Sequence, residues 1–168
     1  MSNENFDNPI ARDRAAKLGD EQTLGVLNDL LENARDGEYG FRACAEQVEN
    51  PQLKQVFNDR AIECRRAAEE LMQWITRRGG APADGGSASG ALHRGWVNLK
   101  GAVGANSDVS ILEECERGED AALARYRAAL KSDALPADVR SMIEQQMLGA
   151  QRNHDQIKAF RDQAKAIS

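Results

Sequence analysis

Aromatic side chains are scarce in this sequence: phenylalanine, tryptophan and tyrosine together make up 5% of its 168 residues. Sheet sandwiches are usually richer in them, whereas abundant alanine and charges that alternate in sign along periodic segments are typical of helices. With 41% apolar and 29% charged residues, the chain suits a single domain with its own core. The composition therefore predicts an all-α globular protein.

Long apolar runs and strong basic clusters are also absent. No segment is apolar enough to span a membrane, and the N-terminus has neither a basic start nor an apolar run, so we expect no membrane partner, no signal peptide and a cytoplasmic location. The formal net charge is -5, and the basic clusters are limited to Arg65-Arg66 and Arg77-Arg78, which argues against nucleic-acid binding. No phosphate loop, nucleotide fingerprint or nucleophile with its base is present, so we expect no nucleotide partner and no catalytic residues.

Cysteine is limited to Cys44, Cys64 and Cys115. The number is odd, no C-x-x-C pair is present, and each residue falls among small apolar residues in a helical pattern. We predict three reduced thiols that fill half-buried positions, with no disulfide framework.

Four long amphipathic helices are predicted from apolar residues spaced three and four apart. We expect a flexible tail over residues 1–20 and a bundle over residues 21–168. Asn50-Pro51 gives a turn so short that the helices on either side must be antiparallel neighbours. The expected helices run from Asp20 or Thr23 to about residue 49, over 51–78, from Ser107 or Asp108 to about 132, and from Pro136 onwards.

The two predicted hairpins are joined by a long connection, residues 79–106. It begins with a stretch rich in glycine and serine and continues into a short fifth helix with Leu92, Trp96, Leu99 and Val103 on one stripe. A helix of 28 residues is roughly 42 Å long at 1.5 Å per residue, and a connection of this length can travel that distance outside the bundle. We therefore predict a crossover that leaves the second and third helices parallel.

A Gly-Glu pair occurs twice in equivalent contexts, as Gly37-Glu38 and Gly118-Glu119. In both copies a heptad pattern assigns the glutamate to a core-facing position. Residues equally far from a turn share a level in an antiparallel hairpin, and Glu38 and Glu63 lie 13 and 12 residues from Pro51. The same count around the second turn brings a glutamine and a histidine opposite the second glutamate. The predicted layer in the middle of the bundle contains Glu38, Glu63, Arg66, Glu119, Gln151 and His154.

This layer resembles the di-iron carboxylate arrangement of ferritin-like bundles, in which two helices each give a glutamate and two others each give a Glu-x-x-His pair. The sequence departs from that pattern twice, because Arg66 stands where a histidine is expected and Gln151 where a glutamate is expected. Three carboxylates and one imidazole remain, which suit one metal ion completed by water.

Residues 21–165 are similar to an uncharacterised bacterial family of ferritin-like four-helix-bundle proteins, a domain of unknown function. The similarity includes the segments 90–96 and 115–122. It implies a ferritin-like four-helix bundle of two antiparallel hairpins joined by a long crossover with a short fifth helix. It also implies membership of a superfamily of iron-storage, oxidase and peroxide-handling bundles, some of which have lost the metal.

Two functional hypotheses follow, and enzymatic activity is left open. In the first, iron or manganese is bound for iron or peroxide handling, and the metal ligands are Glu38, Glu63, Glu119 and His154. In the second, Arg66 neutralises the glutamates, and the protein is a non-catalytic structural or interaction bundle without metal. For the second we expect a homodimer that acts in a stress or surface-attached state.

Overall fold

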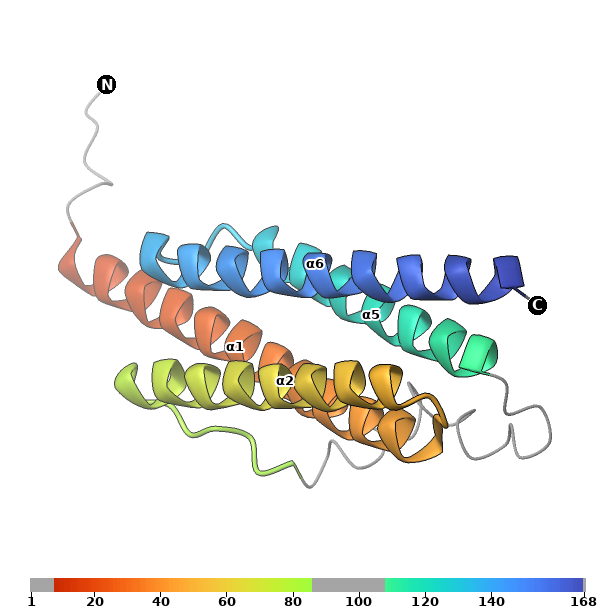
Figure 1. Cartoon of the computed structure of the whole chain (residues 1–168). Helices are drawn as coiled ribbons and strands as arrows, with labels where there is room; N and C mark the ends of the chain where they lie inside the picture. Colours follow the sequence, from red (N-terminus) through yellow and green to blue (C-terminus); the bar gives the residue numbers. More distant parts are fainter. Residues whose placement is uncertain (1–7, 86–107, 168) are drawn as a thin grey trace.

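The structure, a computed structural model, describes residues 8–85 and 108–167. These residues form four helices and no strand: α1 (Pro9–Gln47), α2 (Pro51–Arg77), α5 (Asp108–Leu130) and α6 (Ala137–Ile167). Figure 1 shows them as a bundle of two hairpins, α1 with α2 and α5 with α6. The prediction of an all-α helical bundle is confirmed for the described part of the chain. Among these helices, none combines the length and the apolar character needed to cross a membrane.

The hairpins meet mainly along α1 and α5, whereas α2 and α6 touch at only a few residues. Arg78, just after α2, contacts Asp138 at the start of α6, and Cys115, near the start of α5, contacts Cys44 near the end of α1. Because α2 ends and α5 begins at opposite ends of the bundle, the two helices run in the same direction (Figure 1). The predicted crossover and its short fifth helix lie largely outside the described residues.

Helix α1 begins at Pro9, well before the predicted start at Asp20 or Thr23. Its N-cap is Asn8, whose side-chain oxygen accepts a hydrogen bond from the Ile10 N–H at 3.1 Å, and proline is favoured in the first turn. The start predicted at Asp20 or Thr23 was therefore wrong, and residues 9–20 of the expected flexible tail are helical. They are almost entirely exposed, so this end of α1 extends beyond the bundle core; residues 1–7 lie outside the described part.

Thr23 has a different role from the predicted cap. It is fully buried, and its hydroxyl lies 2.9 Å from the Gly19 carbonyl and 3.2 Å from the Ala134 carbonyl. The second contact ties α1 to the turn between α5 and α6. That turn is also held by Arg140, whose guanidinium donates to the Leu130 and Ser132 carbonyls at the end of α5 at 2.7 and 2.8 Å.

The core consists of two apolar clusters, one towards each end of the bundle. One contains Leu27 to Ala34 of α1 together with the start of α6. The other contains Phe41 to Ala45 of α1, Val48 just after it, the first half of α2 and the start of α5. Between the clusters, every helix contributes residues from the predicted polar layer. The polar layer, whose position was predicted by counting residues from the two turns, therefore lies at the boundary between the two halves of the core.

Candidate functional site

A buried ion pair lies at the boundary between the two apolar clusters. Glu119 of α5 is 1% exposed, and both of its oxygens face Arg60 of α2. The Arg60 Nε donates to Oε1 at 2.5 Å, and Nη2 donates to Oε2 at 3.2 Å. Two parallel hydrogen bonds of this kind are the strongest arrangement for an arginine and a carboxylate. The pair therefore connects the two hairpins across the middle of the bundle.

Burial is the main influence on the charge of Glu119. It raises the pKa of this carboxyl, and the Arg60 guanidinium opposes that rise. The guanidinium lies over the ring of Phe41, 5.5 Å from the ring centroid, which gives it a second favourable contact inside the bundle. Arg60 shares a helix face with Cys64 and Ala67, which are spaced four and seven residues from it. This spacing explains why its side chain points inwards.

The ion pair is one part of a longer polar chain. Arg60 also donates from Nη1 to Glu63 at 3.3 Å, and Asn153 of α6 donates to the same Glu63 oxygen at 2.6 Å. Glu63 is the half-exposed end of this chain, with 49% of its side chain accessible. The contacts join α2 to α5 and α2 to α6, so they fix the position of α2 relative to two helices with which it has few other contacts.

A cleft of about 280 Å³ opens above the ion pair. Its lining comes from all four helices, and Glu119, Arg60 and Tyr126 are among the residues that line it. Arg66 and Arg152 line it as well and are exposed. The sparse contact between α2 and α6 allows this opening.

The prediction that Arg66 neutralises the glutamates was wrong for Glu119. Arg66 is exposed, and it is Arg60, six residues earlier on the same helix, that binds Glu119. The reason is orientation: Arg66 lies beside the inward face that Arg60, Cys64 and Ala67 share. Counting from the turn gives the level of a residue along a helix and leaves its direction around the helix open.

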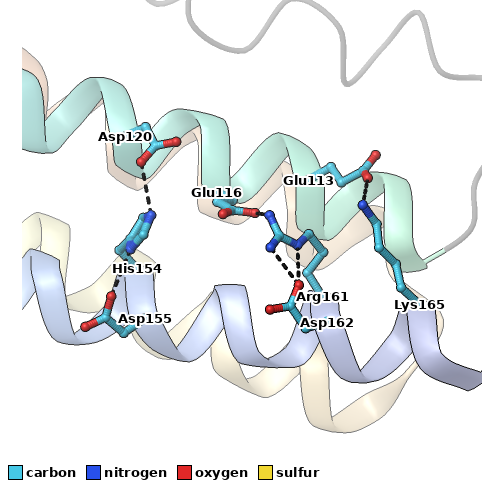
Figure 2. Close-up of polar contacts among 8 residues, drawn as sticks. All are labelled: Glu113, Glu116, Asp120, His154, Asp155, Arg161, Asp162 and Lys165. Atoms are coloured by element: carbon cyan, nitrogen blue, oxygen red, sulfur yellow. Dashed lines mark hydrogen bonds and ion pairs between the residues drawn. The ribbon is translucent and has the colours of Figure 1, made fainter.

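The other predicted layer residues have partners of their own. Glu38 pairs with Arg42 of the next turn at 2.7 Å. His154 lies between two carboxylates, with Nε2 3.0 Å from Asp120 and Nδ1 3.0 Å from Asp155. Figure 2 shows this histidine in the seam between α5 and α6. His154 contacts Asp120, the neighbour of Glu119, and Glu63 shares Arg60 with Glu119, so these residues lie at one level even though their side chains do not converge.

The same seam carries further ion pairs. Arg161 binds Glu116, and the Lys165 ammonium lies 2.5 Å from Glu113 (Figure 2). These contacts are spaced one turn apart on α5 and on α6, so they hold the second hairpin in register. Most of these side chains are partly exposed, and such pairs contribute little stability individually.

The four predicted metal ligands are not arranged around a common point where a metal ion could bind. Among the described residues, no group of three or more histidine, cysteine, aspartate or glutamate side chains is placed to hold one. Both oxygens of Glu119 are engaged by Arg60, and a metal ion would have to displace that guanidinium. Metal binding by Glu38, Glu63, Glu119 and His154 stays a prediction of the sequence, and this arrangement of side chains does not support it.

The structure adds a buried carboxylate that sequence reasoning did not single out. Asp36, directly before the repeated Gly-Glu pair, is 8% exposed, and its Oδ1 has no hydrogen-bond partner among residues 8–85 and 108–167. Its Oδ2 lies 3.4 Å from Arg125 of α5. Burial raises the pKa of Asp36 to about 6, and Arg125 opposes this rise. The only sequence signal was its position directly before the repeated Gly37-Glu38 pair.

Asp36→Asn is expected to stabilise the protein at pH 7.5 by on the order of 1–2 kcal/mol. An unfolded aspartate titrates near pH 3.9, so between about pH 4 and pH 6 the native state holds a proton that the unfolded state lacks. The wild-type protein therefore loses stability as the pH rises through this window, and an asparagine cannot ionise. Urea unfolding at several pH values measures the effect. The gain should vanish towards pH 4, and the exposed Asp29→Asn should show no such pH dependence.

Gly37 permits a close approach of α1 and α2. A Cβ atom at this position would lie 2.8 Å from the Cys64 sulfur, whereas a Cβ at Gly25 on the same helix would meet nothing within 4 Å. The missing side chain at Gly37 therefore allows α1 and α2 to lie close together at the level of Cys64.

Gly25→Ala is expected to raise the free energy of unfolding by about 0.5–1 kcal/mol, because alanine is the better helix former. Gly37→Ala should instead lower it by about 1 kcal/mol, because the crowding of Cys64 outweighs that gain. Thermal and urea unfolding of both variants measure the difference. Adding Cys64→Ala to Gly37→Ala should restore the lost stability. If the double variant stays as unstable as Gly37→Ala, crowding of Cys64 is not the cause of the loss.

Comparison with known proteins identifies a family for this sequence. No curated protein matches the sequence. A family described as a domain of unknown function, DUF2383, matches residues 22–132, which include most of α1, all of α2 and all of α5. Its match contains both copies of the Gly-Glu pair and both members of the ion pair. This chain belongs to the DUF2383 family of domains of unknown function.

Proposed function

We propose that the protein is a non-catalytic, ferritin-like four-helix bundle with a structural or interaction role, in which an ion pair takes the place of a metal centre. The observation that carries this proposal is the paired geometry of Glu119 and Arg60, with two hydrogen bonds at 2.5 and 3.2 Å. A guanidinium in this position neutralises the buried carboxylate and occupies the space that a metal ion would need.

The ferritin-like topology is supported by the directions of the helices. Two antiparallel hairpins are present, and α2 and α5 run in parallel (Figure 1), as a long crossover between them requires. The polar layer also lies between two apolar clusters, and helix bundles build their sites from side chains that face the bundle core. Fold alone does not give function, so the proposal depends on the ion pair.

Elemental analysis of full-length protein, purified without chelator and then incubated with iron(II) or manganese(II), tests the proposal. We expect no stoichiometric metal in the wild-type protein. A stoichiometric metal that is lost in both Glu38→Ala and Glu119→Ala would overturn the proposal in favour of the metal-binding alternative, for iron or peroxide handling. The alternative draws its support from the electrostatic contact of His154 and Glu63 with Glu119.

Self-association is part of the interaction role that we propose, and the sequence predicts a homodimer. Light scattering coupled to size-exclusion chromatography should give twice the mass of one chain. A mass of one chain across the micromolar range would contradict the dimer while leaving the ion-pair proposal intact, because both partners of that pair come from the same chain.

A further inference from the structure

Two of the three cysteines meet in the second apolar cluster. Cys44 of α1 and Cys115 of α5 are both 0% exposed, and their sulfur atoms lie 2.8 Å apart. All three cysteines are free in the structure, and they are buried, in contrast to the predicted half-buried positions. Cys64 is on α2, where it lines the cleft. The pairing of Cys44 with Cys115 was not foreseen from the sequence.

We propose that Cys44 and Cys115 form a redox site that closes to an intramolecular disulfide when the protein is exposed to hydrogen peroxide. The sulfur–sulfur distance of a disulfide is about 2.05 Å, so the two atoms must approach by less than about 1 Å from their present separation. The oxidant is a small two-electron oxidant, hydrogen peroxide, and both reacting sulfur atoms come from this chain.

The reaction consumes one peroxide molecule. One sulfur, as the thiolate, attacks a peroxide oxygen; the O–O bond breaks, a sulfenic acid forms, and the released hydroxide takes up a proton to become water. The second sulfur then displaces the hydroxyl group of the sulfenic acid, so the S–O bond breaks and the S–S bond forms. The displaced hydroxyl leaves as water with the proton of the second thiol. Two thiols lose two electrons in total, and hydrogen peroxide is reduced to two water molecules.

The environment of the pair makes the first step slow. Burial raises the pKa of Cys115 well above its usual value, and the hydrogen bond with Cys44 adds to this effect. The thiolate is the reactive form, so little of it is present near neutral pH, and full burial limits access of peroxide. We therefore expect the pair to react during transient opening of the bundle, under strong or prolonged oxidation.

The disulfide would connect the two hairpins where they pack against each other. The hairpins meet mainly along α1 and α5, and the bond would join residues 71 positions apart in the sequence. A loop of this length contains the whole of α2 and the connection to α5, so closing it strongly restricts the unfolded chain. We expect the oxidised protein to melt on the order of 5–10 °C higher than the reduced protein.

The test is oxidation of the full chain by hydrogen peroxide, in buffer and in mild denaturant that increases opening, followed by alkylation with N-ethylmaleimide under denaturing conditions. Intact-mass spectrometry should show the loss of two hydrogen atoms within single chains. Proteolysis without reduction should give one linked peptide pair that contains Cys44 and Cys115. Cys64 should remain outside the link, and Cys64→Ser should form the same disulfide with the same rise in melting temperature.

Three outcomes would overturn the proposal. The linked peptides could contain Cys64, the disulfides could form only between chains, or both buried thiols could remain alkylatable or end as sulfinic acids in the partly opened protein. Cys44→Ser and Cys115→Ser should each abolish the link. Mapping of the linked peptides in the wild-type and Cys64→Ser proteins decides the question even if Cys44→Ser or Cys115→Ser fails to fold.

Discussion

Arg60→Met is expected to lower the free energy of unfolding by about 3–5 kcal/mol, because it leaves Glu119 buried without a partner. Glu119 is 1% exposed, and both of its oxygens accept hydrogen bonds from Arg60. Methionine retains much of the apolar stem of arginine, so the change removes the charge while it preserves most of the packing over Phe41. Urea unfolding monitored by circular dichroism at pH 7.5 measures the loss.

The matched control is Arg66→Met, on the same helix. Arg66 is exposed and no hydrogen bond or ion pair involves it in the described part of the chain, so its replacement should change stability by less than about 0.5 kcal/mol. Combining Arg60→Met with Glu119→Leu should recover most of the lost stability, because replacing both members of a buried pair by apolar residues is often neutral. If Arg60→Met and Arg66→Met changed the free energy of unfolding equally, the assignment of Arg60 as the partner of Glu119 would be contradicted.

The position of the polar layer could be predicted from the sequence, and its contacts could not. Short turns next to Pro51 and Pro136 fix how far each residue lies along its hairpin, so Glu119, Glu63 and His154 were expected at one level, and their charges do interact. The direction of a side chain around its helix depends on the packing of neighbouring helices. For this reason Arg60 was missed, and Glu38 and His154 were expected to face a common centre.

Contacts between the two hairpins could not be predicted by counting residues from the turns. Cys44 and Cys115 lie on helices from different hairpins, and no short turn fixes the register of one against the other. Their contact depends on how α1 and α5 cross, which the sequence pattern does not specify. The start of α1, in contrast, was available from the sequence: Asn8-Pro9 repeats the Asn50-Pro51 signal that correctly placed the start of α2.

Phe41→Ala is expected to lower the free energy of unfolding by about 3–5 kcal/mol, since it removes a large buried side chain at the edge of the polar layer. Phe41 is 2% exposed and its ring lies 6.3 Å from that of Phe57. It is also the ring over which the Arg60 guanidinium lies. The variant should therefore disturb both the second apolar cluster and the ion pair. Urea unfolding measures the total loss.

A double-mutant cycle separates these two contributions. Phe57 is fully buried in the same cluster, and no cation–π contact joins its ring to Arg60 in the described part of the chain, so it serves as the matched control. The coupling between Phe41→Leu and Arg60→Met should be about 0.5–2 kcal/mol, as for a cation over an aromatic face in a partly desolvated site. The coupling between Phe57→Leu and Arg60→Met should be markedly smaller. Equal couplings would mean that Arg60 is held by general packing, and the ion pair would then owe its position to the whole cluster rather than to one ring.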